Sequence, residues 1–378
     1  MIPFNKPYLS GNELNYIQEA VLSGKISGDG IFTAKCSSFF ESRYNFKKVL
    51  LTTSCTDALE MAALLINIQP GDEIIAPSYT FVSTVNAFAL RGAKIVFCDS
   101  REDHPNIDEN KIEALITNKT RAIIPVHYAG VGCEMDVIMK IANKYNLFVI
   151  EDAAQAIDSY YRGIPLGSIG HMAAFSFHET KNIIAGEGGM LVINDDQFIE
   201  RAEIIREKGT NRSKFFRGEI AKYGWVDLGS SFLPSDIIAA FLYAQLEKID
   251  IIQNRRKGIS AKYRDLLKPL EASGFVKLPN VLEHTTDNGH MFYIICQSFE
   301  IRTELINYLK SNNIYSVFHY LSLHKSEYYK PFINNEDLPN SDNFADCLLR
   351  LPMYFELSDN DIEFICERIS FFYENLNL

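Results

Sequence analysis

Residues 49–66 form the stretch VLLTTSCTDALEMAALLI, a short apolar run followed at once by a segment with helical periodicity. Val49–Leu51 has the length and composition of a buried strand. In the segment that follows, one helix face would carry Ala58, Leu59, Ala62 and Leu65. The same alternation of strand and helix recurs through the first two-thirds of the chain. It predicts an α/β fold with a largely parallel sheet covered by helices on both faces.

The remaining elements follow from the same two periodicities. Strands are predicted at 48–51, 73–76, 94–98, 122–126, 148–151, 173–177 and 190–193, and helices at 56–66, 82–90, 108–116, 136–144 and 196–208. After about residue 230 the order changes to two helices, at 237–248 and on through 267, followed by strands at 290–297 and 315–319 and helices at 303–311 and 359–373. We therefore expect a large domain at 1–245 and a smaller C-terminal α+β domain at 246–378, joined through a long helix.

The composition excludes several classes of protein. Of 378 residues, 47% are hydrophobic and 22% are charged, which is typical of a soluble globular protein. The net charge of −11 argues against nucleic acid or a membrane surface as a partner, because both need a positive field. No apolar run is long enough to span a membrane, and the N-terminus does not look like a signal peptide. Seven scattered cysteines without a C-x-x-C pair predict reduced thiols in a cytoplasmic protein, and we expect no metal site.

Ligands of parallel α/β sheets gather at the carboxyl ends of the strands, so the candidate residues are those just after each strand. Ser54, Cys55 and Thr56 lie where a helix begins, and the free N–H groups there can hold a phosphate. Plain N-capping by Ser54 or Thr56 is the alternative. Asp152 ends a buried strand and either pairs with a cation or caps the next segment. Lys181 precedes a glycine-rich turn and is either a reactive amine or a solvated loop residue.

Taken together, these three sites match the three groups that pyridoxal phosphate (PLP) needs from a protein. The cofactor requires a lysine for its Schiff base, a carboxylate that keeps the pyridine nitrogen protonated, and a cradle for its phosphate. Lys181 and Asp152 lie 29 positions apart (181 − 152), as expected for different strands that border one pocket. A dinucleotide-binding Rossmann enzyme is disfavoured, because the first strand–helix turn lacks the spaced glycines of that motif.

The motifs that surround these residues extend the comparison to a known family. They are IPFNKP at the start, GDEIIAPSYTFVSTVNA, VHYAG, VIEDAAQA, AAFSFHETKNIIAGEGGMLVIND and AEIIREKGTNRSKFFRGE. In order and spacing the chain resembles the DegT/StrS-type nucleotide-sugar aminotransferases, which have the fold-type-I architecture of aspartate aminotransferase. The segments FHETKN and EKGTNRSKFFRG are most similar to the WecE/RffA-type dTDP-4-dehydro-6-deoxyglucose aminotransferases.

The resemblance implies a role for each matching position. Lys181 would form the Schiff base with PLP and later move the proton, and Asp152 would pair with the pyridine nitrogen. Phe81 would stack on the ring and Gln155 would lie near its phenolic oxygen. The phosphate would be held by Ser54, Cys55, Thr56 and Ser176. The family builds its active sites at a homodimer interface, so a segment of the partner chain would complete each pocket.

One motif departs from the family pattern. Many members carry G-x-N-x-R where this chain has GSSFL at 229–233, so that Ser231 stands in place of an asparagine that contacts the phosphate of the neighbouring subunit. The missing arginine could be replaced by a cation of the nearby loop, Arg212, Lys214 or Arg217. Those cations suit the diphosphate of a nucleotide sugar, or they form a solvated charged surface. His178, His319 and Tyr320 would border the sugar, although a histidine at a strand end is more often a packing residue.

The expected activity follows from the resemblance. L-Glutamate would convert PLP to pyridoxamine phosphate, and the amine would pass to the 4-keto carbon of dTDP-4-dehydro-6-deoxy-D-glucose. The product would be a 4-amino-4,6-dideoxyhexose of galacto configuration, used for lipopolysaccharide or another surface polysaccharide. Three alternatives stay open: amination at C3 of a dTDP-3-keto-6-deoxyhexose, a non-catalytic PLP-binding regulator, and a dehydratase. Lys181 disfavours the dehydratase, because those relatives have a histidine at that position.

Overall fold

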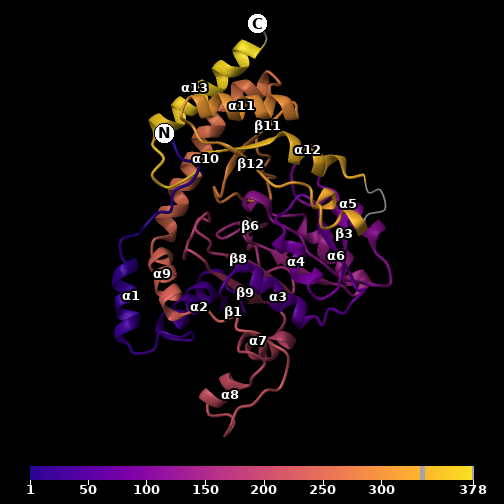
Figure 1. The fold of residues 1–378 in the computed structure, drawn as a ribbon, viewed down its shortest axis with the longest axis vertical. Helices are drawn as coiled ribbons and strands as arrows, with labels where there is room; N and C mark the ends of the chain where they lie inside the picture. Colours follow the sequence, from indigo (N-terminus) through magenta and orange to yellow (C-terminus); the bar gives the residue numbers. More distant parts are fainter. Residues whose placement is uncertain (333–336, 377–378) are drawn as a thin grey trace.

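A computed structural model describes residues 1–332 and 337–376 of the chain (Figure 1). Its larger sheet has seven strands in the order β1-β9-β8-β5-β4-β2-β3. Only β9 runs against its neighbours; the other adjacent pairs are parallel. The strands are β1 (Lys48–Thr52), β2 (Glu73–Pro77), β3 (Lys94–Cys98), β4 (Thr120–Ile123), β5 (Phe148–Asp152), β8 (Met172–Ser176) and β9 (Gly189–Ile193). The predicted largely parallel sheet is therefore confirmed.

Helices cover both faces of this sheet, as the alternation of strand and helix predicts. On one face Leu51 and Val149 pack in a core with α2 (Ile31–Tyr44), α6 (Met135–Tyr145) and α9 (Asp236–Leu246). On the other face Leu50 and Ile150, the neighbouring residues of the same strands, pack in a second core. The helices of that second core are α3 (Cys55–Leu65), α4 (Ser83–Ala89) and α7 (Ile199–Arg206). The near-continuous apolar runs of the strands are thus explained by burial on both sides.

The C-terminal part forms a four-stranded antiparallel sheet in the order β10-β11-β13-β12. Its strands are β10 (Val276–Lys277), β11 (Phe292–Cys296), β12 (Val317–Phe318) and β13 (Leu348–Leu351). A third core joins this sheet to α10 (Ile249–Ala272), α11 (Phe299–Ser311) and α13 (Asp359–Leu376). The long helix α10 runs between the two parts (Figure 1): Ile252 packs in the core of the large sheet, and Leu267 in the core of the small one. The division at residue 245 stays a prediction.

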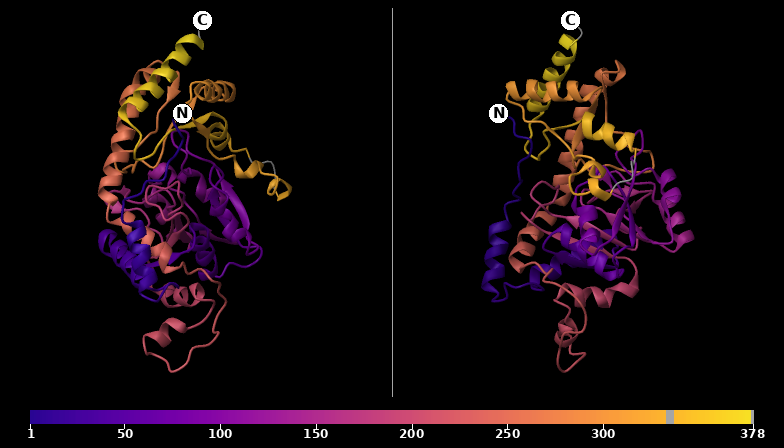
Figure 2. Two further views of the ribbon diagram at one scale, coloured as in Figure 1. Left: turned by 60° about the vertical axis from the view of Figure 1, so that its left-hand side comes forward. Right: turned by 45° about the vertical axis from the view of Figure 1, so that its right-hand side comes forward.

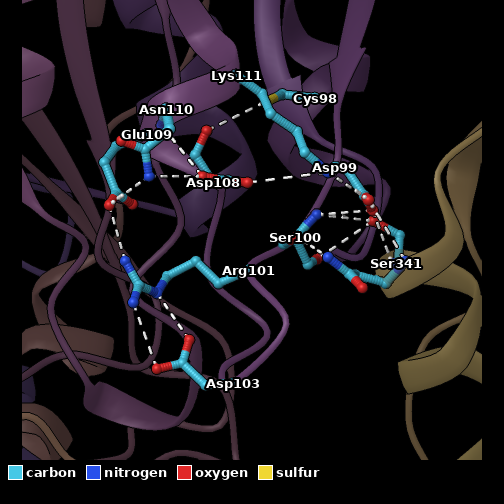
Figure 3. Close-up of polar contacts among 11 residues, drawn as sticks. Cys98, Asp99, Ser100, Arg101, Asp103, Asp108, Glu109, Asn110, Lys111 and Ser341 are labelled. Carbon is cyan, nitrogen blue, oxygen red and sulfur yellow. Dashed lines mark hydrogen bonds and ion pairs between the residues drawn. The ribbon is translucent and has the colours of Figure 1, made fainter.

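A polar cluster ties the C-terminal part to the end of β3 (Figure 3). Asp99 accepts a hydrogen bond of 2.8 Å from the backbone N–H of Ser341, at the start of α12 (Pro339–Cys347), and one of 3.0 Å from Lys111. The hydroxyls of Ser100 and Ser341 lie 3.2 Å apart. Because β13 begins directly after α12, these contacts tie the segment that leads into β13 to the end of β3.

Several boundaries differ from the sequence-based prediction. The strand predicted at 122–126 is Thr120–Ile123 in the structure, because Pro125 cannot donate a ladder hydrogen bond. The helix predicted at 108–116 is only α5 (Glu109–Ile112) followed by a 3₁₀ turn, and the strand at 315–319 shrinks to Val317–Phe318. Among the elements that the sequence analysis did not identify are α1 (Glu13–Leu22), α2, α12 and β13. Within the described ranges, no helix combines the length and the apolar character that a membrane crossing requires.

Candidate active site

A cavity of about 820 Å³ lies where the carboxyl ends of the parallel strands face the small sheet. Volumes of this size are typical of small-molecule sites. The predicted site residues that line it are Ser54, Cys55, Thr56, Phe81, Asp152, Gln155, Ser176, His178, Lys181, His319 and Tyr320. These residues come from five separate parts of the sequence, so the fold brings them together as the strand-end argument predicts.

Lys181 lies in the turn that follows β8, and its backbone N–H donates to the carbonyl of His178 at 2.9 Å. The next residue, Asn182, anchors the turn: its amide donates to Gln253 of α10 at 2.8 Å, and its oxygen lies 2.9 Å from Nδ1 of His290. Burial lowers the pKa of the Lys181 amine; Cys55 and Asp152 oppose this, and the Arg350 cation adds to it. The amine is therefore closer to its neutral, nucleophilic form than an exposed lysine would be.

Asp152 ends β5, and both of its carboxylate oxygens are held by neighbours. Oδ2 accepts a hydrogen bond of 2.6 Å from the hydroxyl of Thr84, and Oδ1 accepts one of 3.1 Å from the N–H of Ala154. Thr84 is itself 2.8 Å from the hydroxyl of Thr80. The carboxylate is 6% exposed and lines the cavity, so it is fixed and available to a cationic ligand atom.

The β1–α3 turn forms the part of the cavity suited to a phosphate. Ser54 is the N-cap of α3, and its hydroxyl oxygen accepts from the N–H of Asp57 at 3.1 Å. Ser54 therefore caps the helix, as the alternative interpretation predicts. Its hydroxyl accepts this bond and still has a proton to donate to a phosphate. The N–H groups of the first turn and the helix dipole favour an anion there. A side chain on Gly189 would lie 2.4 Å from the Ser54 carbonyl carbon, so β9 packs directly against this turn.

A wall of aromatic and polar side chains faces the cavity from the residues at and after β12. Nε2 of Gln155 donates to the Tyr320 hydroxyl at 3.0 Å, while its Oε1 accepts from the N–H of Ala129. The rings of His319 and Tyr320 are stacked with centroids 3.5 Å apart, and Nδ1 of His319 lies 2.6 Å from the Tyr128 hydroxyl. Burial holds the pKa of the His319 imidazole well below its usual range, so the ring is neutral. These contacts define a rigid surface.

Two further predicted residues lie at the edge of the same cavity. Phe81 is 56% exposed, and its ring centroid is 6.0 Å from that of Tyr320. His178 lies in the turn before Lys181, with Nδ1 3.0 Å from the Thr180 hydroxyl and Nε2 3.6 Å from Glu187. Both side chains are accessible from the cavity without being committed to the core.

Four predicted residues lie elsewhere in the chain. Ser231, Arg212 and Arg217 line a second cavity of about 840 Å³, and Lys214 lines neither of the two. The three cations pair with glutamates: Arg212 with Glu207, Lys214 with Glu200, and Arg217 with both Glu203 and Glu219. They belong to the segment 209–231, which we call the arm; it contains α8 (Arg212–Phe216) and projects from the body of the molecule (Figures 1 and 2). Within one chain, the arm does not contribute to the Lys181 cavity.

Among the residues that the sequence analysis missed are three polar or charged ones that the structure places at this cavity or against its carboxylate. Arg350 of β13 and His290 line the cavity, and Thr84 of α4 holds Asp152. Burial and, secondarily, Lys181 keep the pKa of His290 well below its usual range. No local motif marks Arg350 or His290, because both reach the site only through the packing of the small sheet. Thr84 lies in the predicted helix 82–90, where threonine carries no signal of its own.

The groups that line this cavity fit pyridoxal phosphate. An amine of lowered pKa, a fixed carboxylate and a helix N-terminus line one cavity, and these are the groups that the cofactor's aldehyde, ring nitrogen and phosphate need. The Cys55 thiol, at the first position of α3, has its pKa raised well above the usual value by burial, so it stays protonated. In residues 1–332 and 337–376 no three His, Cys, Asp or Glu side chains are arranged to hold a metal ion.

Comparison with known proteins agrees with this fit. The model of the DegT/DnrJ/EryC1/StrS aminotransferase family matches residues 7–370. The spore coat polysaccharide biosynthesis protein SpsC of Bacillus subtilis is 32% identical over 382 residues, which span 97% of this chain and 96% of SpsC. Two solved structures superpose on this chain with similar TM-scores. Spr1654 of Streptococcus pneumoniae in its PMP form gives a TM-score of 0.91 at 26% identity, covering 99% of this chain and 100% of that one. DesV of S. venezuelae, in complex with a ketimine intermediate, gives a TM-score of 0.88 at 29% sequence identity, and the match covers 97% of each chain.

Proposed function

The chain belongs to the DegT/DnrJ/EryC1/StrS aminotransferase family and is a PLP-dependent sugar aminotransferase of the fold-type-I architecture; from this premise we propose its donor, acceptor and site residues. The donor is L-glutamate, and the acceptor is dTDP-4-dehydro-6-deoxy-D-glucose. The product is dTDP-4-amino-4,6-dideoxyhexose with the galacto configuration. Bound PLP supplies an aldehyde that takes up the donor's amine and a protonated ring that accepts electrons from the donor's α-carbon.

One observation carries the assignment of roles: Lys181 and Asp152 line the same cavity as the N-terminus of α3. We assign Lys181 to bond the cofactor and, once released, to move the proton between the donor's α-carbon and the cofactor. Its lowered pKa suits this work, because a neutral amine can accept a proton. Asp152 holds the ring nitrogen protonated, and its two hydrogen bonds from Thr84 and Ala154 keep the carboxylate oriented.

The other predicted residues bind rather than react. Ser54, Cys55, Thr56 and Ser176 hold the phosphate, Phe81 stacks on the ring, and Gln155 contacts its phenolic oxygen. His178, His319 and Tyr320 border the sugar. The neutral state of His319 supports this assignment, since a neutral ring can donate or accept a hydrogen bond with a hydroxyl of the substrate.

A homodimer with shared active sites completes the proposal. The arm exposes large apolar side chains to solvent, among them Phe216 at 68%, Trp225 at 78% and Leu228 at 55%. A soluble protein rarely leaves such a group uncovered, and a second copy of the chain would bury it. The same contact would bring Ser231, Arg212, Lys214 and Arg217 to the partner's cavity, where the cations suit a diphosphate.

The biological role that we propose is surface polysaccharide synthesis in the cytoplasm. Its support is the similarity to SpsC, which acts in spore coat polysaccharide biosynthesis. The test is to incubate the PLP-loaded protein with L-glutamate and either a 3-keto or a 4-keto dTDP sugar, and to identify the product by NMR. A 4-amino sugar is expected. A 3-amino sugar would overturn the regiochemistry, and no amino sugar from either acceptor would overturn the substrate assignment.

A further inference from the structure

Asn182 is a buried amide directly after Lys181, and both ends of its side chain are hydrogen-bonded. Its Nδ2 donates to Oε1 of Gln253 at 2.8 Å and to the carbonyl of Asn288 at 2.9 Å, while its Oδ1 lies 2.9 Å from Nδ1 of His290. All three partners are buried, and they come from α10 and from the segment that leads into β11. A buried polar network whose members are all bonded is rigid.

The orientation of the Asn182 amide follows from its partners. The carbonyl of Asn288 can only accept a hydrogen bond, so the nitrogen of Asn182 must lie on that side. Its oxygen therefore lies on the side of His290. Reversing the amide would place two oxygens against each other in a buried place, which is costly. The contact with His290 is thus made by an acceptor.

The position of the proton on His290 follows from the same contact. The oxygen of Asn182 has no proton, so Nδ1 of His290 must be the donor. Burial keeps the pKa of the imidazole well below its usual range, and the cations Lys181, Arg256 and Arg350 add to this effect. The ring is therefore neutral, with its proton on Nδ1. Nε2 keeps a free lone pair, has no hydrogen-bond partner among the described residues, and belongs to a side chain that lines the cavity.

The same network reaches the backbone of Gln155. Nδ2 of Asn288 donates to the carbonyl of Gln155 at 2.8 Å. Asn288 fits there because the residue beside it is Gly130: a Cβ on that glycine would lie 2.2 Å from Oδ1 of Asn288. Through Asn182 and Asn288, the turn that carries Lys181 is therefore fixed to the segment that carries Gln155.

We propose that Asn182 is a positioning residue, which holds the Lys181 turn at a fixed distance from Gln155 and keeps His290 in its Nδ1–H form. The side chain of Lys181 is long and flexible, so its reach is set by the place of its backbone. The inference rests on the proposed function, in which Lys181 bonds the cofactor's aldehyde and Gln155 contacts its phenolic oxygen. These two groups are neighbours on the pyridine ring, so the two residues must keep their spacing. Asn182 does not line the cavity itself and acts through its neighbours.

The first test locates the proton of His290. NMR of the full-length protein with ¹⁵N-labelled imidazoles distinguishes a proton on Nδ1 from one on Nε2, and the signal missing from His290→Asn identifies the residue. Without cofactor, at neutral pH, the parent should carry the proton on Nδ1. Asn182→Ala should lose this preference. Asn143→Ala, which changes an exposed asparagine of α6, is the matched control and should keep it.

The second test separates positioning from binding. The phosphate cradle and Asp152 hold PLP without Asn182, so equilibrium dialysis should give Asn182→Ala a PLP affinity close to that of the parent. The first half-reaction with L-glutamate, followed by cofactor absorbance, should slow about 10- to 100-fold, because a small displacement of a reacting group is costly. His290→Asn keeps an N–H donor near the place of Nδ1, and it should recover most of the rate that His290→Leu loses. Asn143→Ala should match the parent in both measurements.

Each contrary result overturns the inference. A proton on Nε2 in the parent would do so, and so would a PLP affinity and a half-reaction rate that fall together in Asn182→Ala, or equal rates in His290→Asn and His290→Leu. If Asn182→Ala does not fold, the NMR of the parent and the two His290 variants decide. Failure of the proposed function looks different: a parent that uses another amino acid but not L-glutamate loses the proposed donor, and the same rates are then compared with that amino acid.

Discussion

The hydroxyl of Thr84 donates a 2.6 Å hydrogen bond to Oδ2 of Asp152, which joins the start of α4 to the end of β5 directly beside the cavity. A carboxylate that must hold a protonated ring nitrogen needs a fixed orientation, and this bond supplies it from a neighbouring element. Thr80 extends the contact by one more hydroxyl, so the orientation of Asp152 depends on the turn that also carries Phe81.

Thr84→Val removes the hydroxyl and keeps the shape of the side chain. Because a hydrogen bond to a charged group contributes about 1.5–3 kcal/mol, we expect PLP to bind at least about tenfold more weakly. Thr84→Ser should restore most of the affinity. Equilibrium dialysis of each apoprotein against PLP measures the affinity. Equal affinity in the parent, Thr84→Val and Thr84→Ser would contradict a positioning role for Thr84.

Asp152→Asn tests the carboxylate itself. The amide keeps the size of the side chain and can still accept from Thr84, but it cannot hold a positive ring nitrogen. Breaking a buried ion pair costs about 3–5 kcal/mol, so turnover should fall by roughly two to three orders of magnitude. The protein should still fold, which its thermal unfolding would report. Activity close to that of the parent would remove Asp152 from the proposed role.

Two substitutions near Lys181 should shift the pKa of its amine in opposite directions. In the apoprotein the amine should react with acetic anhydride with a midpoint below the ordinary lysine value of about 10.5, because burial disfavours the charged form. Arg350→Gln removes a nearby cation and should move the midpoint up, whereas Asp152→Asn removes a nearby anion and should move it down. Mass spectrometry of the Lys181 peptide follows the reaction, with the exposed Lys119 as the reference for reagent concentration.

The same shift has a consequence for the stability of the apoprotein. A lysine whose pKa is lower in the folded chain binds fewer protons there than in the unfolded chain. Its contribution to the free energy of unfolding therefore rises with pH between the lowered value and about 10.5, and Lys181→Met should flatten that part of the profile. Urea unfolding at a series of pH values measures it, and identical profiles for the two proteins would contradict the shift.

The arm predicts complementation between two inactive chains. Lys181→Ala lacks the reactive amine, and a chain with Arg212→Gln and Arg217→Gln has a defective arm. If each arm completes the partner's site, a mixed dimer contains one site with both an intact Lys181 and an intact arm. Mixing after mild dissociation should then restore measurable turnover. If each preparation stays as inactive as before, although ultracentrifugation shows exchange of chains, the sites are not shared.

How far the sequence predicts this site depends on where each residue lies. Lys181, Asp152 and Ser54 follow strands of a parallel sheet, and strand ends on such a sheet converge by geometry alone, so reasoning from the sequence finds them. Arg350 lies on β13, a strand of four residues that starts directly after α12 and has no turn signal to mark it. Its approach to Lys181 depends on how the small sheet packs on the large one.

The same distinction explains the elements that were missed. The internal strands of the large sheet are apolar on both faces and stand out in the sequence, as β5 and β8 do. Helix α2 shows no clear apolar stripe in its sequence, because its buried face includes the polar Thr33 while the apolar Ile31 is 53% exposed. The arm residues form a basic cluster in the sequence, but in the structure glutamates pair with these cations, and the arm does not line the Lys181 cavity of the same chain.

The most direct test of the central claim is borohydride reduction of the PLP-loaded protein, followed by peptide mapping. The cofactor should be found attached to the Nζ of Lys181 and to no other lysine, and Lys181→Ala should retain none of it after reduction and denaturation. Cofactor attached to another lysine, or a protein that carries no reducible bond to PLP at all, would contradict the assignment of this cavity as the active site.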